Sequence, residues 1–183
     1  MGKIAVHEFV SLDGVFEDPR WTAEFGFAEA MGRAIGEVTS ASKAILLGRR
    51  TFEMFAPAWS TRSPDDDPGV PFFNNTPKYV VSTTLENADA WQNSQLLGAY
   101  DATAIQELKD RVDGNVYISG SGTLVRALLA DGLVDELHLF VFPVILGAGA
   151  RLFSDGTPRT TLALTGTEAY DNGALHLTYV PAA

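Results

Sequence analysis

The chain contains no cysteine among its 183 residues, which excludes disulfide bonds and thiolate metal sites. Its apolar runs are short, and none approaches the roughly 18–20 residues that a membrane-spanning helix needs. The N-terminal stretch reaches His7 and Glu8 too early for the apolar core of a signal peptide. A reducing cytoplasm suits such a chain, and we expect a cytoplasmic protein without a membrane partner.

Positive charge is also scarce. Thirteen Lys and Arg residues face 23 Asp and Glu residues, which gives a formal net charge of −10. Because nucleic-acid affinity depends on neutralising phosphates, this balance argues against a nucleic-acid-binding protein. A single anionic ligand is compatible with it only where the few cations are concentrated locally.

The remaining composition is ordinary for a globular protein, with 46% apolar and 20% charged residues, and we expect one domain over residues 1–183. The three histidines, His7, His138 and His176, all fall in predicted strands. They lack cysteine or carboxylate companions at ligand spacing, so the sequence predicts packed or edge histidines and no metal site.

Hydrophobic periodicity predicts alternating strands and helices as far as residue 134. A helical stripe begins near Phe25, with Thr22 as its N-cap. We expect strands at 3–11, 43–47, 78–82, 95–97, 115–119 and 135–142, and helices at 25–38, 49–56, 102–112 and after residue 122. Residues 57–77 carry five prolines and an acidic run, which is typical of either a functional flap or an insertion.

The chain ends in a predicted hairpin around Asn172-Gly173, a pair that tolerates the positive φ of a tight turn. The whole pattern therefore predicts an α/β fold of three layers, with a mostly parallel central sheet and an antiparallel C-terminal hairpin edge. This edge, together with the apolar stretch 140–153, leads us to expect a homodimer.

Two strand-to-helix junctions have the chemistry of an anion site. One is Gly48-Arg49-Arg50-Thr51, and the other is Gly120-Ser121-Gly122. A helix N-terminus presents unpaired N–H groups, glycine lets a ligand approach the backbone, and arginine adds a fixed positive charge. The alternative for the glycines is a tight turn without a ligand, and for the arginines a solvated helix start.

Five stretches, SLDGV, LLGRRTFE, KYVVS, VYISGSGTLVRALLADGLVDEL and PVILGAGARLF, together resemble the dihydrofolate reductase superfamily. They are more closely similar to the C-terminal reductase domain of the bifunctional riboflavin-biosynthesis deaminase-reductase and its stand-alone relatives. The resemblance covers about residues 3–180 and implies an NADPH-binding reductase, with Arg49 reading the ribose phosphate. The implied cofactor contacts are Gly48, Arg49, Arg50, Thr51, Ser82, Thr83, Gly120, Ser121, Gly122, Thr123 and Leu124.

The resemblance also places the loop at Asp13 and Gly14 beside the nicotinamide and the substrate. We expect Asp13, or a water molecule that it holds, to be the proton donor. The other interpretation of Asp13 is an Asp-Gly turn whose carboxylate caps the backbone. Aromatic residues after this loop indicate an apolar pocket for a flat or hydrophobic substrate: Phe16, Trp21, Phe25 and Phe27, with Phe55 and Trp59 further along the chain. The alternative, that these aromatics belong to the core, applies to some of them.

We therefore expect an NADPH-dependent oxidoreductase. The helix after the first loop carries no acid where the folate enzymes have one, which argues against folate. The deaminase part of the riboflavin enzyme is absent, and the early loops offer its substrate phosphate only Arg20. Two alternatives stay open: a true reductase of the riboflavin precursor, and a non-catalytic nucleotide-binding protein of the same fold.

Overall fold

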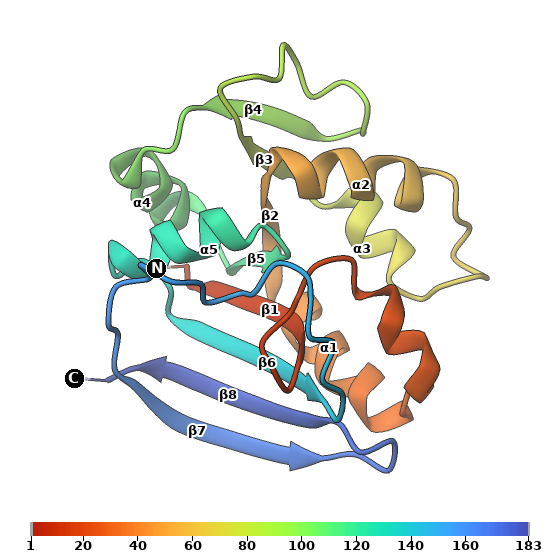
Figure 1. Ribbon diagram of the computed structural model, residues 1–183. Coiled ribbons are helices and arrows are strands. Elements are labelled where there is room, and N and C mark those ends of the chain that lie inside the picture. The colour runs from red at the N-terminus through yellow and green to blue at the C-terminus, as the bar shows by residue number, and fades with distance from the viewer. Residues whose placement is uncertain (1, 183) are drawn as a thin grey trace.

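The computed structural model describes residues 2–182, which form one eight-stranded sheet with helices on both faces (Figure 1). The strand order is β4-β3-β2-β5-β1-β6-β8-β7. The strands are β1 (Ile4–Ser11), β2 (Ser42–Gly48), β3 (Lys78–Val81), β4 (Ser94–Gly98), β5 (Asn115–Ser119), β6 (Glu136–Phe142), β7 (Leu162–Ala169) and β8 (Leu175–Pro181). All pairs from β4 to β6 are parallel, whereas β8 runs antiparallel to both its neighbours, which confirms the predicted sheet.

Two helix layers cover the sheet, as predicted. On one face, α4 (Ala102–Arg111) and α5 (Gly122–Ala130) bury their leucines and Ile105 against β1, β2 and β5. On the other face pack α1 (Glu29–Ser40), α2 (Arg49–Ser60) and α3 (Val70–Asn75). Among residues 2–182, no helix has both the length and the apolar character that crossing a membrane requires.

The predicted start of the first helix is wrong. Residues Pro19–Phe25 form a 3-10 helix, within which the Thr22 hydroxyl donates to the Pro19 carbonyl, and α1 begins only at Glu29 with Ala28 as its N-cap. The periodic stripe from Phe25 misled the prediction because Phe25 packs on the same cluster as α1 although it precedes the helix.

The proline-rich segment 57–77 packs on the α2 side of the sheet. Its first part extends α2 through Pro57 to Ser60, and its last part forms α3, whose Val70 and Phe73 are buried. Buried Lys78 stabilises the end of α3, because its ammonium donates to the carbonyls of Phe73 and Thr76 at 2.8 and 2.9 Å. Lys78 thus holds the end of the segment, whereas residues 61–66 between its two helices are exposed.

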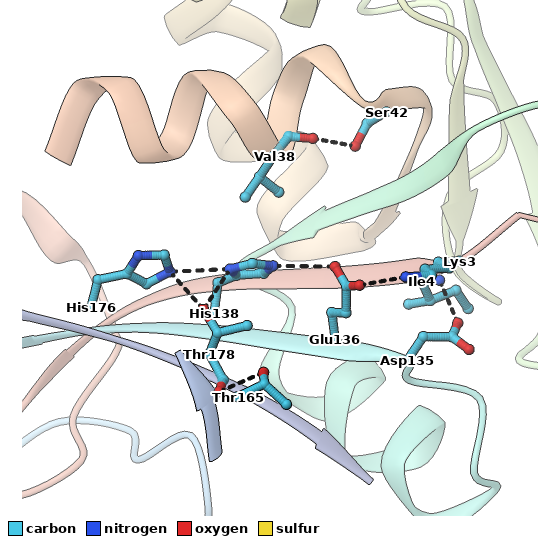
Figure 2. Close-up of polar contacts among 10 residues, drawn as sticks. All are labelled: Lys3, Ile4, Val38, Ser42, Asp135, Glu136, His138, Thr165, His176 and Thr178. Carbon is cyan, nitrogen blue, oxygen red and sulfur yellow. Dashed lines mark hydrogen bonds and ion pairs between the residues drawn. The ribbon is translucent and has the colours of Figure 1, made fainter. Parts of the chain in front are cut away.

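The three histidines meet on the α1 face of the sheet, where β1, β6 and β8 are neighbours. Figure 2 shows His138 between His176, whose Nε2 lies 3.1 Å from His138 Nδ1, and Glu136, which pairs with Lys3 at 2.7 Å. His7 is in register with His138 and lies 2.7 Å from the Tyr117 hydroxyl. Burial lowers the pKa of His7 to about 3 and that of His176 to about 4.

These histidines predict an acid-sensitive fold. Since His176 binds its proton more weakly in the folded than in the unfolded state, the unfolded state holds more protons between about pH 4 and 6.5, and stability falls as pH decreases through that window. Replacing His176 with Phe keeps the stacking on Phe140, whose ring centroid lies 4.3 Å away. The free energy of unfolding is measured by urea titration at pH 7 and at pH 4.5. We expect it to fall less between these two pH values in His176→Phe than in the wild type. Equal decreases in both proteins would contradict this role.

β7 forms one edge of the sheet and leaves Leu164 half exposed. Such an edge is a surface for pairing with another chain. The homodimer across it stays a prediction.

Candidate dinucleotide site

A cleft of about 810 Å³ opens where the central strands β2, β5 and β1 end. Because these strands are parallel and adjacent, their carboxyl ends reach the same edge of the sheet, where ligands of open α/β sheets bind. The segments that follow them are therefore brought together: Arg49 to Thr51 after β2, the glycine turn after β5, and the loop from Phe16 to Pro19 after β1. This juxtaposition confirms that the two predicted junctions lie side by side.

Ser121 joins the two junctions directly. Its hydroxyl oxygen accepts a hydrogen bond from the Gly48 N–H at 2.7 Å and donates to the Thr51 hydroxyl at 2.8 Å. Ser121 has a φ of +66°, a left-handed conformation that is uncommon outside glycine and that surrounding contacts must maintain. The two hydrogen bonds provide these contacts, so the distance between the starts of α2 and α5 is fixed.

Glycine is required on both sides of Ser121. Gly120 has a φ of +69°, and a Cβ atom there would lie 3.0 Å from the Thr51 hydroxyl oxygen. At Gly122 a Cβ atom would lie only 2.4 Å from the Phe16 ring. Contacts within the protein, with Thr51 and Phe16, therefore account for both glycines, as the interpretation of a tight turn requires.

Both helices start without a side-chain cap. Gly48, the N-cap of α2, has no side chain that could cap the helix. Ser121, the N-cap of α5, has a hydroxyl, but it forms no hydrogen bond to its own helix. The first N–H groups of an uncapped helix are unpaired and carry partial positive charge. The cleft is lined by both first turns, so their donors are available to an anion at one place.

The cleft also collects positive side chains. Arg49 and Arg50 line it from α2, Arg126 lines it from α5, and Arg151 lines it from the loop after β6. Arg126 in addition donates to the Leu152 carbonyl at 2.9 Å, which holds this loop against α5. Four of the thirteen cations of an acidic chain therefore face one cleft, which meets the condition of locally concentrated charge.

The adenosine-side residues predicted after β3 lie differently. Ser82 is buried, and its hydroxyl accepts from the N–H groups of Thr84 and Leu85 at 3.1 and 3.0 Å. Thr83 is exposed. Neither residue is among those that line the cleft, whereas the preceding Val81 is. The structure thus brings Val81, rather than Ser82 and Thr83, to the cleft wall.

The contacts of Asp13 are those of the other interpretation, an Asp-Gly turn whose carboxylate caps the backbone. Its carboxylate accepts from the Ser11 hydroxyl at 2.6 Å and from the N–H groups of Leu146 and Gly147 at 3.1 and 2.9 Å. These donors lower the pKa of Asp13 to about 2, the Ser11 hydroxyl contributing most. Asp13 caps the backbone of the loop after β6 and is not among the residues that line the cleft, so its role as proton donor stays a prediction.

Other loop contacts fix the same wall of the cleft. The Gly14 carbonyl accepts from the Leu152 N–H at 2.9 Å, and the Phe16 N–H donates to the Ala150 carbonyl at 3.1 Å. Gly14 has a φ of +81°, as its turn requires, but it does not line the cleft. The SLDG loop is therefore a support for the cleft rather than its surface.

Of the aromatic residues predicted to form the substrate pocket, Phe16 and Phe55 line the cleft, whereas Trp21, Phe25, Phe27 and Trp59 do not. Trp21 and Phe25 instead pack against Phe142 in the core beside α1, each with a ring-centroid distance of 5.6 Å. The alternative that some of these aromatics belong to the core applies to this pair. The aromatic residues that do line the cleft are Phe9, Phe16, Phe55 and Tyr100.

Sequence reasoning missed Glu8. This residue lies in β1, is 3% exposed and lines the cleft beside Gly120, whose N–H donates to Glu8 Oε2 at 3.1 Å. Burial raises its pKa to about 8. The available signal was an acid inside a strand that is apolar on both faces.

The residues that the structure describes contain no group of three or more histidine and carboxylate side chains that is able to hold a metal ion. The first turns of α2 and α5 and four arginines converge on the cleft, together with the acids Glu8, Glu17 and Asp18. This donor set fits phosphate oxygens.

Comparison with known proteins agrees with this architecture. The chain is 30% identical to the uncharacterized protein YwjB of Bacillus subtilis (strain 168), over 98% of both chains. Among solved structures, a putative riboflavin biosynthesis protein from Shewanella sp. PV-4 matches with a TM-score of 0.81 and 22% identity, over the full length of both chains. The dihydrofolate reductase from Enterococcus faecalis matches with a TM-score of 0.64 and 14% identity, over 100% of this chain and 98% of that chain.

These two structural matches establish a dihydrofolate reductase-like fold. The family described as the RibD C-terminal domain matches residues 2–176, nearly the whole chain. With the sheet order, the two uncapped junctions and this match in agreement, the chain belongs to the RibD C-terminal domain family.

Proposed function

We propose that this protein is an NADPH-dependent reductase of a small, flat or hydrophobic organic molecule. The observation that carries the proposal is the Ser121 link, which fixes two uncapped helix N-termini side by side in one arginine-lined cleft. A pyrophosphate needs several N–H donors at a fixed spacing, and this arrangement supplies them. A solved protein of the same fold, the Enterococcus faecalis dihydrofolate reductase, is complexed with NADP(H).

The residues present fit such a cofactor. The first turn of α5, from Gly122 to Leu124, would hold the pyrophosphate through backbone N–H groups, and Arg49 would hold the ribose phosphate. Bound NADPH would supply the hydride. Phe16 and Phe9 would offer apolar surface to the nicotinamide end of the cofactor. The loops at 13–18 and 144–152, which hydrogen bonds join to each other, would exclude water from it.

Reduction of the phosphorylated riboflavin precursor is the second candidate. Sequence reasoning found only Arg20 for its phosphate, and Arg20 is exposed, pairs with Asp18 and does not line the cleft. The cleft however contains Arg126 and Arg151, from segments far from the early loops. These two cations are the observation that favours a phosphorylated substrate.

Fluorescence of NADPH on titration with the protein tests the binding step. A screen of NADPH oxidation with quinones, dihydrofolate and the riboflavin precursor then tests the reaction. We expect binding, and turnover with at least one acceptor. Binding without turnover on any of them would favour the non-catalytic nucleotide-binding alternative, and binding of neither NADPH nor NADH would contradict the dinucleotide site.

Arg49→Ala tests the choice of cofactor. Since a hydrogen bond to a charged group contributes about 1.5–3 kcal/mol, we expect the Kd for NADPH to rise roughly 10- to 100-fold, while the Kd for NADH, which lacks the ribose phosphate, changes little. Arg33→Ala is the matched control, because Arg33 forms an equivalent i,i+4 pair with Glu29 on α1, away from the cleft. An equal rise in the Kd for NADPH and for NADH would contradict the assignment of Arg49 to the ribose phosphate.

Ser121→Ala tests the link between the junctions. The variant leaves the Gly48 N–H without its partner, and we expect the free energy of unfolding to fall by about 1–3 kcal/mol, together with weaker NADPH binding. Thr51→Val removes only the hydrogen bond that Ser121 donates and retains the one from Gly48, so its effects should be smaller. Urea unfolding and NADPH fluorescence measure both quantities. Destabilisation with unchanged NADPH affinity would show that the link does not position the site.

A further inference from the structure

Glu8 is an acid in a place built for apolar side chains. It follows Val6 and precedes Val10 on the face of β1 that α5 covers, and both valines belong to the buried core. β1 lies between β5 and β6 in the centre of the sheet, and Glu8 is 3% exposed. Its carboxyl group nevertheless lines the cleft, beside the start of the glycine turn.

The two oxygens of this carboxyl group differ. Oε2 accepts from the Gly120 N–H at 3.1 Å, whereas Oε1 is buried and has no hydrogen-bond partner among residues 2–182. No cation of the described chain forms an ion pair with Glu8 at 4.0 Å or less. An unpaired buried carboxylate is costly, and such a group takes up a proton instead. The neutral form is therefore favoured, in agreement with the raised pKa of about 8.

A neutral carboxyl group has a hydroxyl donor as well as a carbonyl acceptor. When the carbonyl oxygen accepts from Gly120, the hydroxyl at Oε1 has no acceptor among residues 2–182. Buried polar groups without a partner are rare in native proteins and require an explanation. An acceptor atom of a ligand that reaches Oε1 from the cleft would satisfy this one.

We propose that Glu8 is a residue of the dinucleotide site that acts as a neutral acid, its carbonyl oxygen accepting from the Gly120 N–H and its hydroxyl donating to an oxygen acceptor of the bound ligand. The inference rests on the proposed function, since the ligand is the anionic dinucleotide. It adds a residue that the sequence comparison with reductases does not assign, and it makes ligand binding depend on the protonation of one side chain.

The surroundings of Glu8 support a proton-linked site. Tyr117 on the neighbouring β5 stays neutral because burial raises its pKa, and His7 points to the opposite face of the sheet. The charged and titratable groups that face the same cleft are Arg49 and Arg50 of α2, Arg126 of α5, Glu17, Asp18 and Arg151 of the loops, and Tyr100. A phosphate that binds next to Gly120 adds negative charge beside Glu8, which favours its neutral form further.

The test is the Kd for NADPH between pH 7 and 9.5, measured by fluorescence on the full chain. The phosphate of NADPH, with a second pKa near 6, is fully ionised in this window. If only the protonated form binds, the apparent Kd is the intrinsic one divided by the protonated fraction, so it should rise roughly tenfold between pH 7 and 9. Glu8→Gln keeps a carbonyl and an N–H donor without a titrating proton, and we expect its Kd to stay constant and close to the wild-type value at pH 7.

Glu17→Gln is the matched control, because it makes the same side-chain change in the same cleft at an exposed residue, whose carboxylate accepts from the Ala150 N–H at 2.9 Å. It should retain the wild-type dependence on pH. A wild-type Kd that is constant over the window, or one that rises equally in Glu8→Gln, would overturn the role of Glu8 and leave the NADPH site in place. No NADPH binding at any pH would overturn both proposals.

Calorimetry of the wild type provides a second measurement that does not depend on the folding of a variant. Binding enthalpies in buffers of different ionisation enthalpy give the number of protons taken up. We expect close to one proton per NADPH at pH 9.5 and close to none at pH 7. The absence of uptake at pH 9.5 would overturn the proposal, even if Glu8→Gln failed to fold.

Discussion

The geometry of the cleft depends on one side chain, the hydroxyl of Ser121. Parallel strands alone bring the ends of β2 and β5 to the same edge of the sheet, but they leave the following helices free to tilt. Ser121 removes this freedom, because its hydroxyl bonds to both the Gly48 N–H and the Thr51 hydroxyl. Its own backbone adopts a left-handed conformation to do so. The two hydrogen bonds that define the spacing of the helix starts also offset the strain of that conformation.

The electrostatics of the cleft contrast with those of the chain as a whole. A protein with a net charge of −10 repels anions at long range, so an anion site needs a strong local field that salt and distance do not screen away. The two helix N-termini and four arginines supply positive field over one cleft, against the exposed acids Glu17 and Asp18 at its lining. An ionised Glu8 would oppose it from the floor of the cleft, which is a second reason to expect that the acid is neutral when an anion binds.

The sequence predicted those parts of the molecule that local patterns determine. The alternation of strands and helices, the Asn172-Gly173 hairpin and the two glycine-containing junctions follow from periodicity and turn chemistry, and the structure confirms them. The roles of Asp13, Trp21 and Phe25 depend on partners more than a hundred residues away, at Phe142 and in the loop at 146–147. No local pattern contains this information, because the same Asp-Gly turn and the same aromatics are compatible with a cleft or with a core.

Asp13 and Glu8 show how the fold gives two similar acids opposite properties. Hydrogen-bond donors surround Asp13 and keep it ionised, whereas an apolar strand and a single N–H surround Glu8 and keep it protonated. The contacts of Asp13 stabilise a loop, which explains why an acid is present at this position. The arrangement around Glu8 costs stability that a valine or leucine at the same position would not cost. Folding alone therefore gives no reason for Glu8, and its position on the floor of the cleft, next to the glycine turn, gives one.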